Sequence, residues 1–175
     1  GRFILPMAEK SSRDTIIIGT DIDEKPLRGT MNKAKKADTY HKISLIVTDA
    51  KHLSFKSNVF STISSNFGFD NVPEAAIAFK EGARVLQPDG RIVFSSLWVK
   101  ENSESMQLAE KYNVGQMASE MRLEKTLQKA GLVLEWVEKV YAGVWPYNPM
   151  DLLPVEGEEY ANIIAQARKR KDQPI

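Results

Sequence analysis

The sequence predicts an α/β protein built on a doubly wound, mostly parallel sheet with an antiparallel final strand. Strand patterns alternate with helix patterns along most of the 175 residues, which is the chain order that parallel strands joined by crossover helices require. The runs at residues 15–20 and 91–98 consist mainly of apolar and β-branched residues, as in strands buried on both faces. We expect a single domain over residues 1–175, since a chain of this length can bury one sizeable core.

The first part of the chain is expected to alternate between helices and buried strands. A short helix is predicted over residues 3–10, where apolar residues recur at helical spacing. The run at 15–20 predicts a strand, and Asp23 follows it at a position where it can cap a helix over about residues 24–37. The next strand is predicted at residues 43–48.

The second part of the chain continues this order and ends in two strands. A strand is predicted at residues 59–64, and Pro73 is expected to open a helix because proline is favoured in the first turn. A later helix is expected to end at Gly131. The last two strands, predicted at residues 132–141 and 160–167, are expected to form an antiparallel hairpin.

A tight turn at residues 86–91 joins a predicted helix to a predicted strand. Pro88 cannot continue the helix, and Gly90 can adopt the positive φ that such turns often need. The turn lies at the amino end of its strand, whereas ligands of open α/β sheets bind beyond the carboxyl ends. Asp89 and Arg91 are therefore poor catalytic candidates.

Composition and charge narrow the class of protein. The hydrophobic content of 42% and the charged content of 27% are those of an ordinary globular protein. The net charge of +1 argues against strong attraction to nucleic acid or to an anionic membrane, and the basic run at residues 168–171 is expected to be a solvated tail. The absence of cysteine excludes disulfides, thiolate metal sites and cysteine nucleophiles. No apolar run approaches the roughly 18 residues of a membrane-spanning helix, so we expect a cytoplasmic protein. We also expect no metal site.

Two aspartates end neighbouring predicted strands. Beyond such a strand the Asp21 carboxylate can accept both hydroxyl protons of a ribose. The Asp49 carboxylate can accept from an exocyclic amine such as that of adenine, and the small Ala50 leaves room for the ring. Alternatively, Asp21 is a helix cap or a solvated turn residue, and Asp49 is an ordinary turn residue.

An amide and an aromatic side chain, Asn66 and Phe67, follow the next predicted strand. This pair can hold a zwitterionic amino-acid group and shield a reactive sulfonium from water. Alternatively, Phe67 and Phe69 fill the core beneath a loop. His52 is a candidate general base, and its alternative is that it only continues a loop.

The segment at residues 141–150 is rich in aromatic side chains, among them Tyr141, Trp145 and Tyr147. If the last two strands form a hairpin, this segment lies at the ligand end of the sheet. It can then form an apolar pocket or a lid for the substrate. A structural cover for the edge of the sheet is the alternative.

The order and spacing of these segments resemble class I S-adenosylmethionine-dependent methyltransferases, from residue 1 to about residue 168. Residues 18–23 are similar to the segment whose acid binds the ribose of the cofactor, and residues 48–50 are similar to the turn that contacts its adenine. Residues 60–68 match the fourth-strand motif of that family, except that Ser61 stands where the family often has Asp.

This resemblance implies a Rossmann-like fold and an enzyme that transfers a methyl group from S-adenosylmethionine to a small-molecule acceptor. Residues 1–3 would be the very end of a glycine-rich loop, with Gly1 its remaining glycine, and Ile22 would pack on the adenine. Residues 66–68 and 71–72 resemble, more narrowly, quinone C-methyltransferases. The residues implied to bind the cofactor are Gly1, Asp21, Ile22, Asp49, Ala50, Asn66 and Phe67, and those implied to bind the acceptor are Tyr141, Trp145 and Tyr147.

The resemblance also implies that a strand precedes the first residue of the chain. In the family this strand lies at the centre of the sheet, and its glycine-rich loop leads into the helix predicted at residues 3–10. Without it, two buried strand edges would carry unpaired backbone groups, each costing about 1–3 kcal/mol. We therefore expect the natural protein to extend upstream of Gly1.

Two alternatives to a methyltransferase remain open. A nicotinamide-dependent oxidoreductase of Rossmann type also uses a strand-ending acid on ribose, although the Asp49–Ala50 turn and the antiparallel final pair favour the methyltransferase. The other alternative is a methyltransferase-like module that binds partners without catalysis.

Methyl transfer from a sulfonium is an in-line displacement with an activated leaving group, so it requires no catalytic base in advance.

Overall fold

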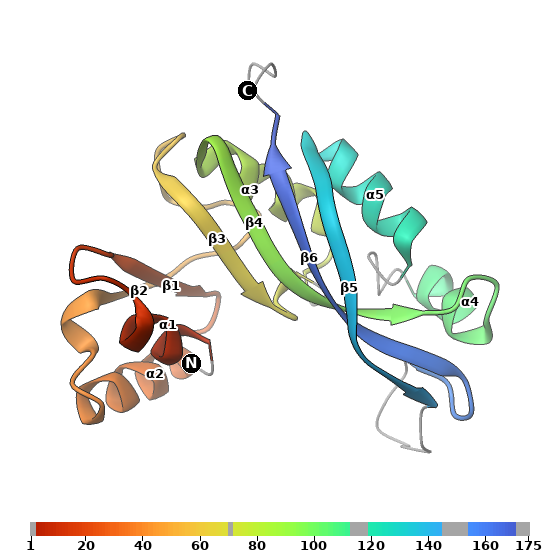
Figure 1. Cartoon of the computed structure of the whole chain (residues 1–175), viewed down its shortest axis with the longest axis horizontal. Coiled ribbons are helices and arrows are strands. Elements are labelled where there is room, and N and C mark those ends of the chain that lie inside the picture. Colours follow the sequence, from red (N-terminus) through yellow and green to blue (C-terminus); the bar gives the residue numbers. More distant parts are fainter. Residues whose placement is uncertain (1–2, 70–71, 113–118, 145–153, 171–175) are drawn as a thin grey trace. The chain divides into compact units, whose positions relative to one another are not determined.

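The chain divides into two compact units, Gly1–Ser54 and Phe55–Ile175, and each unit is described by itself. Both units contain strands and helices, as the sequence predicts (Figure 1). The expected single domain over the whole chain stays a prediction. The computed structural model describes residues 3–69, 72–112, 119–144 and 154–170.

The first unit contains a pair of parallel strands and the helices beside them. β1 and β2 pair in register over their whole length. The carboxylate of Asp23 accepts the backbone N–H of Lys25, which confirms Asp23 as the cap of the second helix. The elements are α1 (Ile4–Lys10), β1 (Ile17–Asp21), α2 (Glu24–Lys36), the 3-10 helix η1 (Tyr40–Lys42) and β2 (Ile43–Val47).

A small apolar core joins these elements. A Cβ atom on Gly19 would lie 2.6 Å from Cδ1 of Ile4 and 2.7 Å from Cδ2 of Leu45, so glycine in β1 lets α1 and β2 approach closely. The buried members of the core are Ala8, Ile17, Ala34 and Ile43.

The second unit is built on a four-stranded sheet in the order β3-β4-β6-β5. β3 and β4 are parallel, whereas β6 is antiparallel to both β4 and β5, which confirms the predicted antiparallel final strand. The elements are β3 (Phe60–Asn66), α3 (Ala75–Val85), β4 (Leu86–Val99), α4 (Glu104–Lys111), α5 (Glu120–Lys129), β5 (Leu132–Val144) and β6 (Glu159–Lys169).

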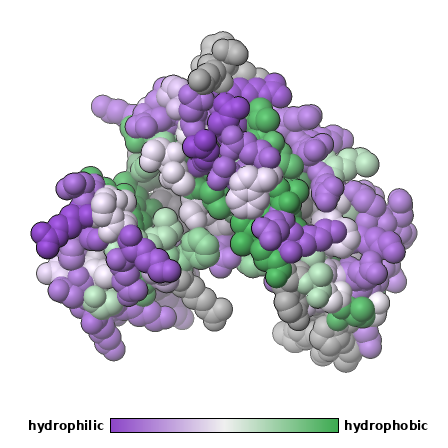
Figure 2. All heavy atoms as spheres, viewed as in Figure 1, coloured by the Kyte–Doolittle hydropathy of each residue, from purple (hydrophilic) through white to green (hydrophobic). Residues whose placement is uncertain are grey.

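The core of this unit lies between the sheet and the helices α3 and α5, which cover one face of the sheet (Figure 1). Phe79 stacks on Phe69 with ring centroids 4.2 Å apart, and Phe94 packs edge-on to Phe79 at 5.0 Å. Phe69 is thus a core residue, as the structural alternative predicted. Val93 of β4 and Ile164 of β6 are half-buried. Figure 2 shows hydrophobic surface over the central part of this unit.

The turn at residues 86–91 differs from its prediction. β4 begins at Leu86, directly after α3, and the pairing with β3 is interrupted by a bulge before Arg91. The positive φ of 61° belongs to Asp89 and not to Gly90. Gly90 is needed for a different reason, because a Cβ atom there would lie 2.9 Å from the carbonyl oxygen of Gln87.

The opening of α3 is also displaced from its prediction. The helix begins at Ala75, two residues after Pro73, so the prediction that Pro73 opens it is wrong. Glu74 adopts a left-handed conformation with φ 61° and ψ 51°, which separates the proline from the helical residues. Gly131, with φ 75°, follows α5 as predicted.

The expected solvated tail at residues 168–171 is wrong for its first two members. Both belong to β6, where Lys169 pairs with Leu132 of β5 and is 7% exposed. The Arg168 guanidinium donates to the carboxylates of Glu135 at 2.9 Å and Asp89 at 3.2 Å. A charged run in the sequence suggests an exposed tail, but here the pairing of β6 with β5 removes Lys169 from solvent.

Within the described part of the chain, β1 and β3 are edge strands with one strand neighbour each. β1 pairs only with β2 there, and β3 pairs only with β4. The expectation of a further strand upstream stays a prediction.

Candidate functional site

The parallel pairing of β1 and β2 brings the two candidate aspartates to the same edge of their sheet. Asp21 is the last residue of β1 and lies opposite Val47, the last residue of β2. The N–H of Thr48 donates to the carbonyl of Asp21 at 2.9 Å, and Asp49 follows directly. This edge is formed by the carboxyl ends of both strands, where ligands bind in open α/β sheets.

The Asp21 carboxylate is oriented by the backbone of the turn that follows it. Its Oδ1 atom accepts the N–H of Asp23 at 3.0 Å. Because the cap of α2 is Asp23, the helix-cap alternative for Asp21 is wrong. Ile22, between the two acids, is 71% exposed and presents apolar surface at the same edge.

The Asp49 carboxylate is held in a similar way. Its Oδ1 atom accepts the N–H of Lys51 at 2.8 Å, and its side chain is 36% exposed. Ala50, between these residues, is half-buried. The imidazole of His52 is 82% exposed, and its Nδ1 atom lies 3.9 Å from Oδ2 of Asp49, which is beyond hydrogen-bond distance.

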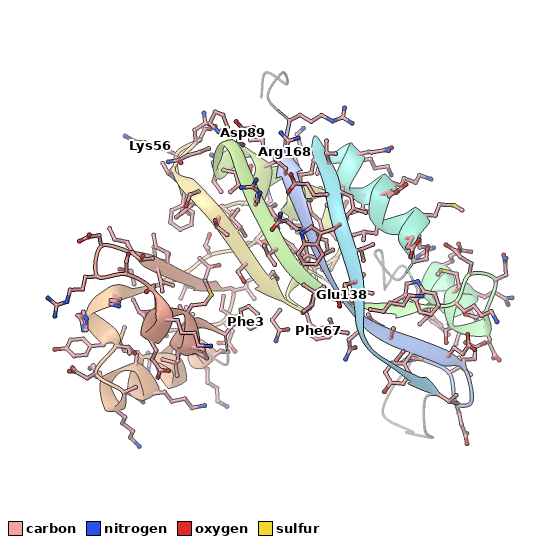
Figure 3. All side chains as sticks on the ribbon, viewed as in Figure 1. Phe3, Lys56, Phe67, Asp89, Glu138 and Arg168 are labelled. Atoms are coloured by element: carbon pink, nitrogen blue, oxygen red, sulfur yellow. The ribbon has the colours of Figure 1, made fainter. Side chains whose placement is uncertain are left out.

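The other described cofactor candidates lie in the second unit, at the carboxyl end of β3. Asn66 is the last residue of β3, and Phe67 follows with a positive φ of 53°. The Asn66 side-chain oxygen accepts the Ser95 hydroxyl at 2.6 Å, and the N–H of Phe67 points to the same hydroxyl oxygen at 3.1 Å. Figure 3 shows Phe67 at the end of the sheet opposite to Asp89 and Arg168.

Ser95 is the residue of this group that sequence reasoning missed. It lies beside Asn66 because β3 and β4 are parallel and in register at that point. A signal was present, since Ser95 and Ser96 interrupt the otherwise apolar run at residues 92–99.

The remaining candidates are described in part or not at all. Tyr141 lies in β5, where its backbone pairs with Asn162 of β6. Gly1, Trp145 and Tyr147 lie outside the described residues. The structure therefore groups the candidates by unit, with Asp21, Ile22, Asp49 and Ala50 in the first unit, and Asn66, Phe67 and Tyr141 in the second.

Two negative observations concern the described residues alone. None of their helices is long and apolar enough to span a membrane. None of their histidine, aspartate and glutamate side chains gather in groups of three or more that could hold a metal ion.

Comparison with known proteins points to one family. A family model described as a methyltransferase domain matches residues 1–94. The ubiquinone/menaquinone biosynthesis C-methyltransferase UbiE of Rickettsia prowazekii is 33% identical over 96 residues, which cover 53% of this chain and 39% of that protein. The demethylmenaquinone methyltransferase of Staphylococcus saprophyticus is 40% identical over 77 residues, which cover 44% of this chain and 32% of that protein. The chain thus spans well under half the length of either relative.

Solved structures share the fold of the chain at low sequence identity. The cyclase SpnF superposes with a TM-score of 0.73 at 14% identity. The superposition covers 95% of this chain and 69% of the cyclase chain. Geranyl diphosphate methyltransferase in complex with SAM superposes with a TM-score of 0.66 at 13% identity. This superposition covers 89% of this chain and 69% of the methyltransferase chain. The predicted Rossmann-like α/β fold is confirmed.

Proposed function

Because this chain belongs to the methyltransferase domain family, we propose that it transfers a methyl group from S-adenosylmethionine to a small-molecule acceptor. The observation that carries the proposal is the parallel register of β1 and β2, which sets Asp21 and Asp49 at one edge of their sheet. Both aspartates lie within the residues that match the family, 1–94. Two carboxylates at such an edge supply the acceptors that ribose hydroxyls and an adenine amine require.

The described residues of the first unit fit the nucleoside part of this cofactor. Hydrogen bonds from the backbone fix one oxygen of each carboxylate, so both side chains are oriented before a ligand binds. The exposed Ile22 offers apolar surface on which an adenine ring can pack, and a small residue at Ala50 leaves room for it. We assign Asp21 to the ribose hydroxyls and Asp49 to the adenine amine.

The residues after β3 fit the other end of the cofactor. The Asn66 amide can hydrogen-bond the amino-acid group, and Phe67 can shield the reacting centre from water. Bound S-adenosylmethionine would supply an activated methyl group on a sulfonium. The chain's own residues then need only to bind, to orient and to exclude water, and no general base is assigned. The exposure of His52 argues against that role for it.

For the acceptor we propose a small, partly apolar molecule of the quinone class. The two relatives are named for methylation in ubiquinone and menaquinone biosynthesis, and for demethylmenaquinone. The near-neutral charge of the chain gives no support to a polyanionic acceptor. Tyr141, Trp145 and Tyr147 remain the residues proposed to bind it.

The proposal is tested by the affinity of the chain for S-adenosylhomocysteine, measured by titration calorimetry. Asp21→Ala should weaken binding at least tenfold, because it removes the charged acceptor for two ribose hydroxyls. Asp14→Ala is the matched control, since it removes an exposed carboxylate from the same unit, before β1. Unchanged affinity in Asp21→Ala, or an equal loss in the control, would contradict the assignment. Binding of NAD in place of S-adenosylhomocysteine would support the oxidoreductase alternative.

A further inference from the structure

The hydroxyl of Ser95 makes two contacts with the residues that follow β3. Its oxygen lies 2.6 Å from Oδ1 of Asn66 and 3.1 Å from the backbone nitrogen of Phe67. The carbonyl of Ser95 also accepts the N–H of Phe67, at 3.2 Å. One residue of β4 therefore contacts both the side chain of Asn66 and the backbone of the next residue.

These distances determine which atom of the Asn66 amide faces Ser95. A separation of 2.6 Å is typical of O–H···O hydrogen bonds and shorter than the usual range for N–H···O. The hydroxyl oxygen accepts the N–H of Phe67 and donates its single proton to the amide oxygen. Nδ2 of Asn66 is consequently turned away from Ser95, with two N–H donors directed elsewhere.

The backbone after β3 is held in an uncommon conformation at the same point. Phe67 has a φ of 53°, which is unfavourable for an aromatic residue. A Cβ atom on Gly68 would lie 2.5 Å from Oγ of Ser65, so a larger residue there would force the turn to shift. The two contacts of Phe67 with Ser95 support this conformation.

We propose that Ser95 is a positioning residue that turns the Asn66 amide so that its NH₂ group faces the ligand. The turn at residues 66–68 would then select a carboxylate, such as the one in the amino-acid part of S-adenosylmethionine. This inference rests on the proposed function, and it names the part of the cofactor that Asn66 binds. An Asn66 held the other way round would present an acceptor and select an ammonium group.

Two ligands separate this role from a general structural one. S-adenosylhomocysteine carries the carboxylate, whereas 5′-methylthioadenosine keeps the nucleoside and the sulfur but lacks the whole amino-acid group. Ser95→Ala should weaken binding of S-adenosylhomocysteine about tenfold, the cost of losing one oriented hydrogen bond to a charged group, and leave 5′-methylthioadenosine within about twofold. Calorimetry with both ligands measures this selectivity.

Two further variants sharpen the test. Asn66→Asp keeps the acceptor for Ser95 but replaces the NH₂ group by an anionic oxygen, so its loss of S-adenosylhomocysteine affinity should exceed that of Ser95→Ala. Ser95→Thr keeps the hydroxyl and should retain the selectivity. Ser64→Ala is the matched control, since Ser64 is an exposed serine on β3 beside Val93 of β4.

The outcomes distinguish this inference from the proposed function. Wild-type chain that binds neither ligand contradicts the proposed function and this inference with it. Wild-type chain that binds both, with Ser95→Ala losing the two ligands equally or neither of them, contradicts the role of Ser95 alone. Selective loss in Ser95→Ala and Asn66→Asp, with selectivity retained in Ser95→Thr and Ser64→Ala, supports it.

Discussion

At the scale of single residues, Lys169 shows how the fold determines the environment of a charge. Its ammonium donates to the side chain of Asn58 at 2.8 Å and to the carbonyl of Leu86 at 2.9 Å. It thereby joins the end of β6 to the segment before β3 and to the start of β4. Burial lowers the pKa of Lys169 below its ordinary value of 10.5, because removal from water disfavours the charged form.

Lys169→Met should lower the free energy of unfolding, by a larger amount at about pH 10 than at pH 7. Between the lowered pKa of folded Lys169 and the ordinary value, the unfolded chain binds more protons than the folded chain. The stability of the wild type therefore rises with pH in that window, and the variant lacks this rise. Urea unfolding at both pH values measures the difference in free energy of unfolding between wild type and variant. A difference that is the same at both pH values, or smaller at about pH 10 than at pH 7, would contradict the account.

Residue roles that follow from local sequence could be predicted, and those that depend on strand register could not. Asp23 was identifiable as a cap because its neighbours already form a helix start. Asp21 and Asp49 were identifiable because both end runs with strand character. The contact between Ser95 and Asn66 spans 29 positions in sequence and exists only through the register of β3 and β4.

At the scale of elements, the start of α4 is held by a carboxylate from a distant segment. Glu158 accepts the backbone N–H groups of Glu104 at 2.7 Å and Ser105 at 2.9 Å, which begin the helix. The buried hydroxyl of Ser105 in turn accepts the N–H of Val155 at 2.8 Å. Burial raises the pKa of Glu158, but hydrogen bonds outweigh it and lower the pKa below 4.5. They come from the side chain of Ser105, from the backbone of Ser105 and Glu104, and from the side chain of Ser103.

Glu158→Ala should lower the free energy of unfolding by about 1 kcal/mol at pH 7, since charge-assisted hydrogen bonds to a half-buried group are lost. This stabilisation is fully present above pH 4.5 and is lost as the pH falls through the lowered pKa of folded Glu158. Chemical unfolding as a function of pH should show the two proteins converging in acid.

The neighbouring exposed Glu156 provides the control, because Glu156→Ala removes a charge from the same segment. The free energy of unfolding of that variant should match the wild-type value both at pH 7 and in acid. A difference between wild type and Glu158→Ala that persists in acid would show that the carboxylate does not hold α4 through its charge.

The order of elements was predictable, while their boundaries depended on backbone geometry that composition does not reveal. Gly90 looked like the residue with positive φ because glycine carries no steric penalty there, yet the bulge in β4 places that conformation at Asp89. In the same way, the left-handed Glu74 moves the start of α3 past Pro73.

At the scale of the whole molecule, the alternation of strands and helices was sufficient to predict the fold class. Continuous apolar runs indicated buried parallel strands, and the hairpin of β5 with β6 supplied the antiparallel end. The aromatic candidates could not be given roles in this way, because Trp145 and Tyr147 have no periodic pattern that ties them to a strand or a helix. The family match covers the part of the chain that carries the aspartates and Asn66.

The central claim is that the chain binds S-adenosylmethionine, and thermal unfolding in the presence of candidate cofactors tests it most directly. A ligand at one hundred times its dissociation constant stabilises the folded protein by about 2.7 kcal/mol, which raises the midpoint of a chain of this size by several degrees. S-adenosylmethionine and S-adenosylhomocysteine should both raise the midpoint, and NAD should leave it unchanged. A midpoint raised by NAD alone, or by none of the three, would contradict the account.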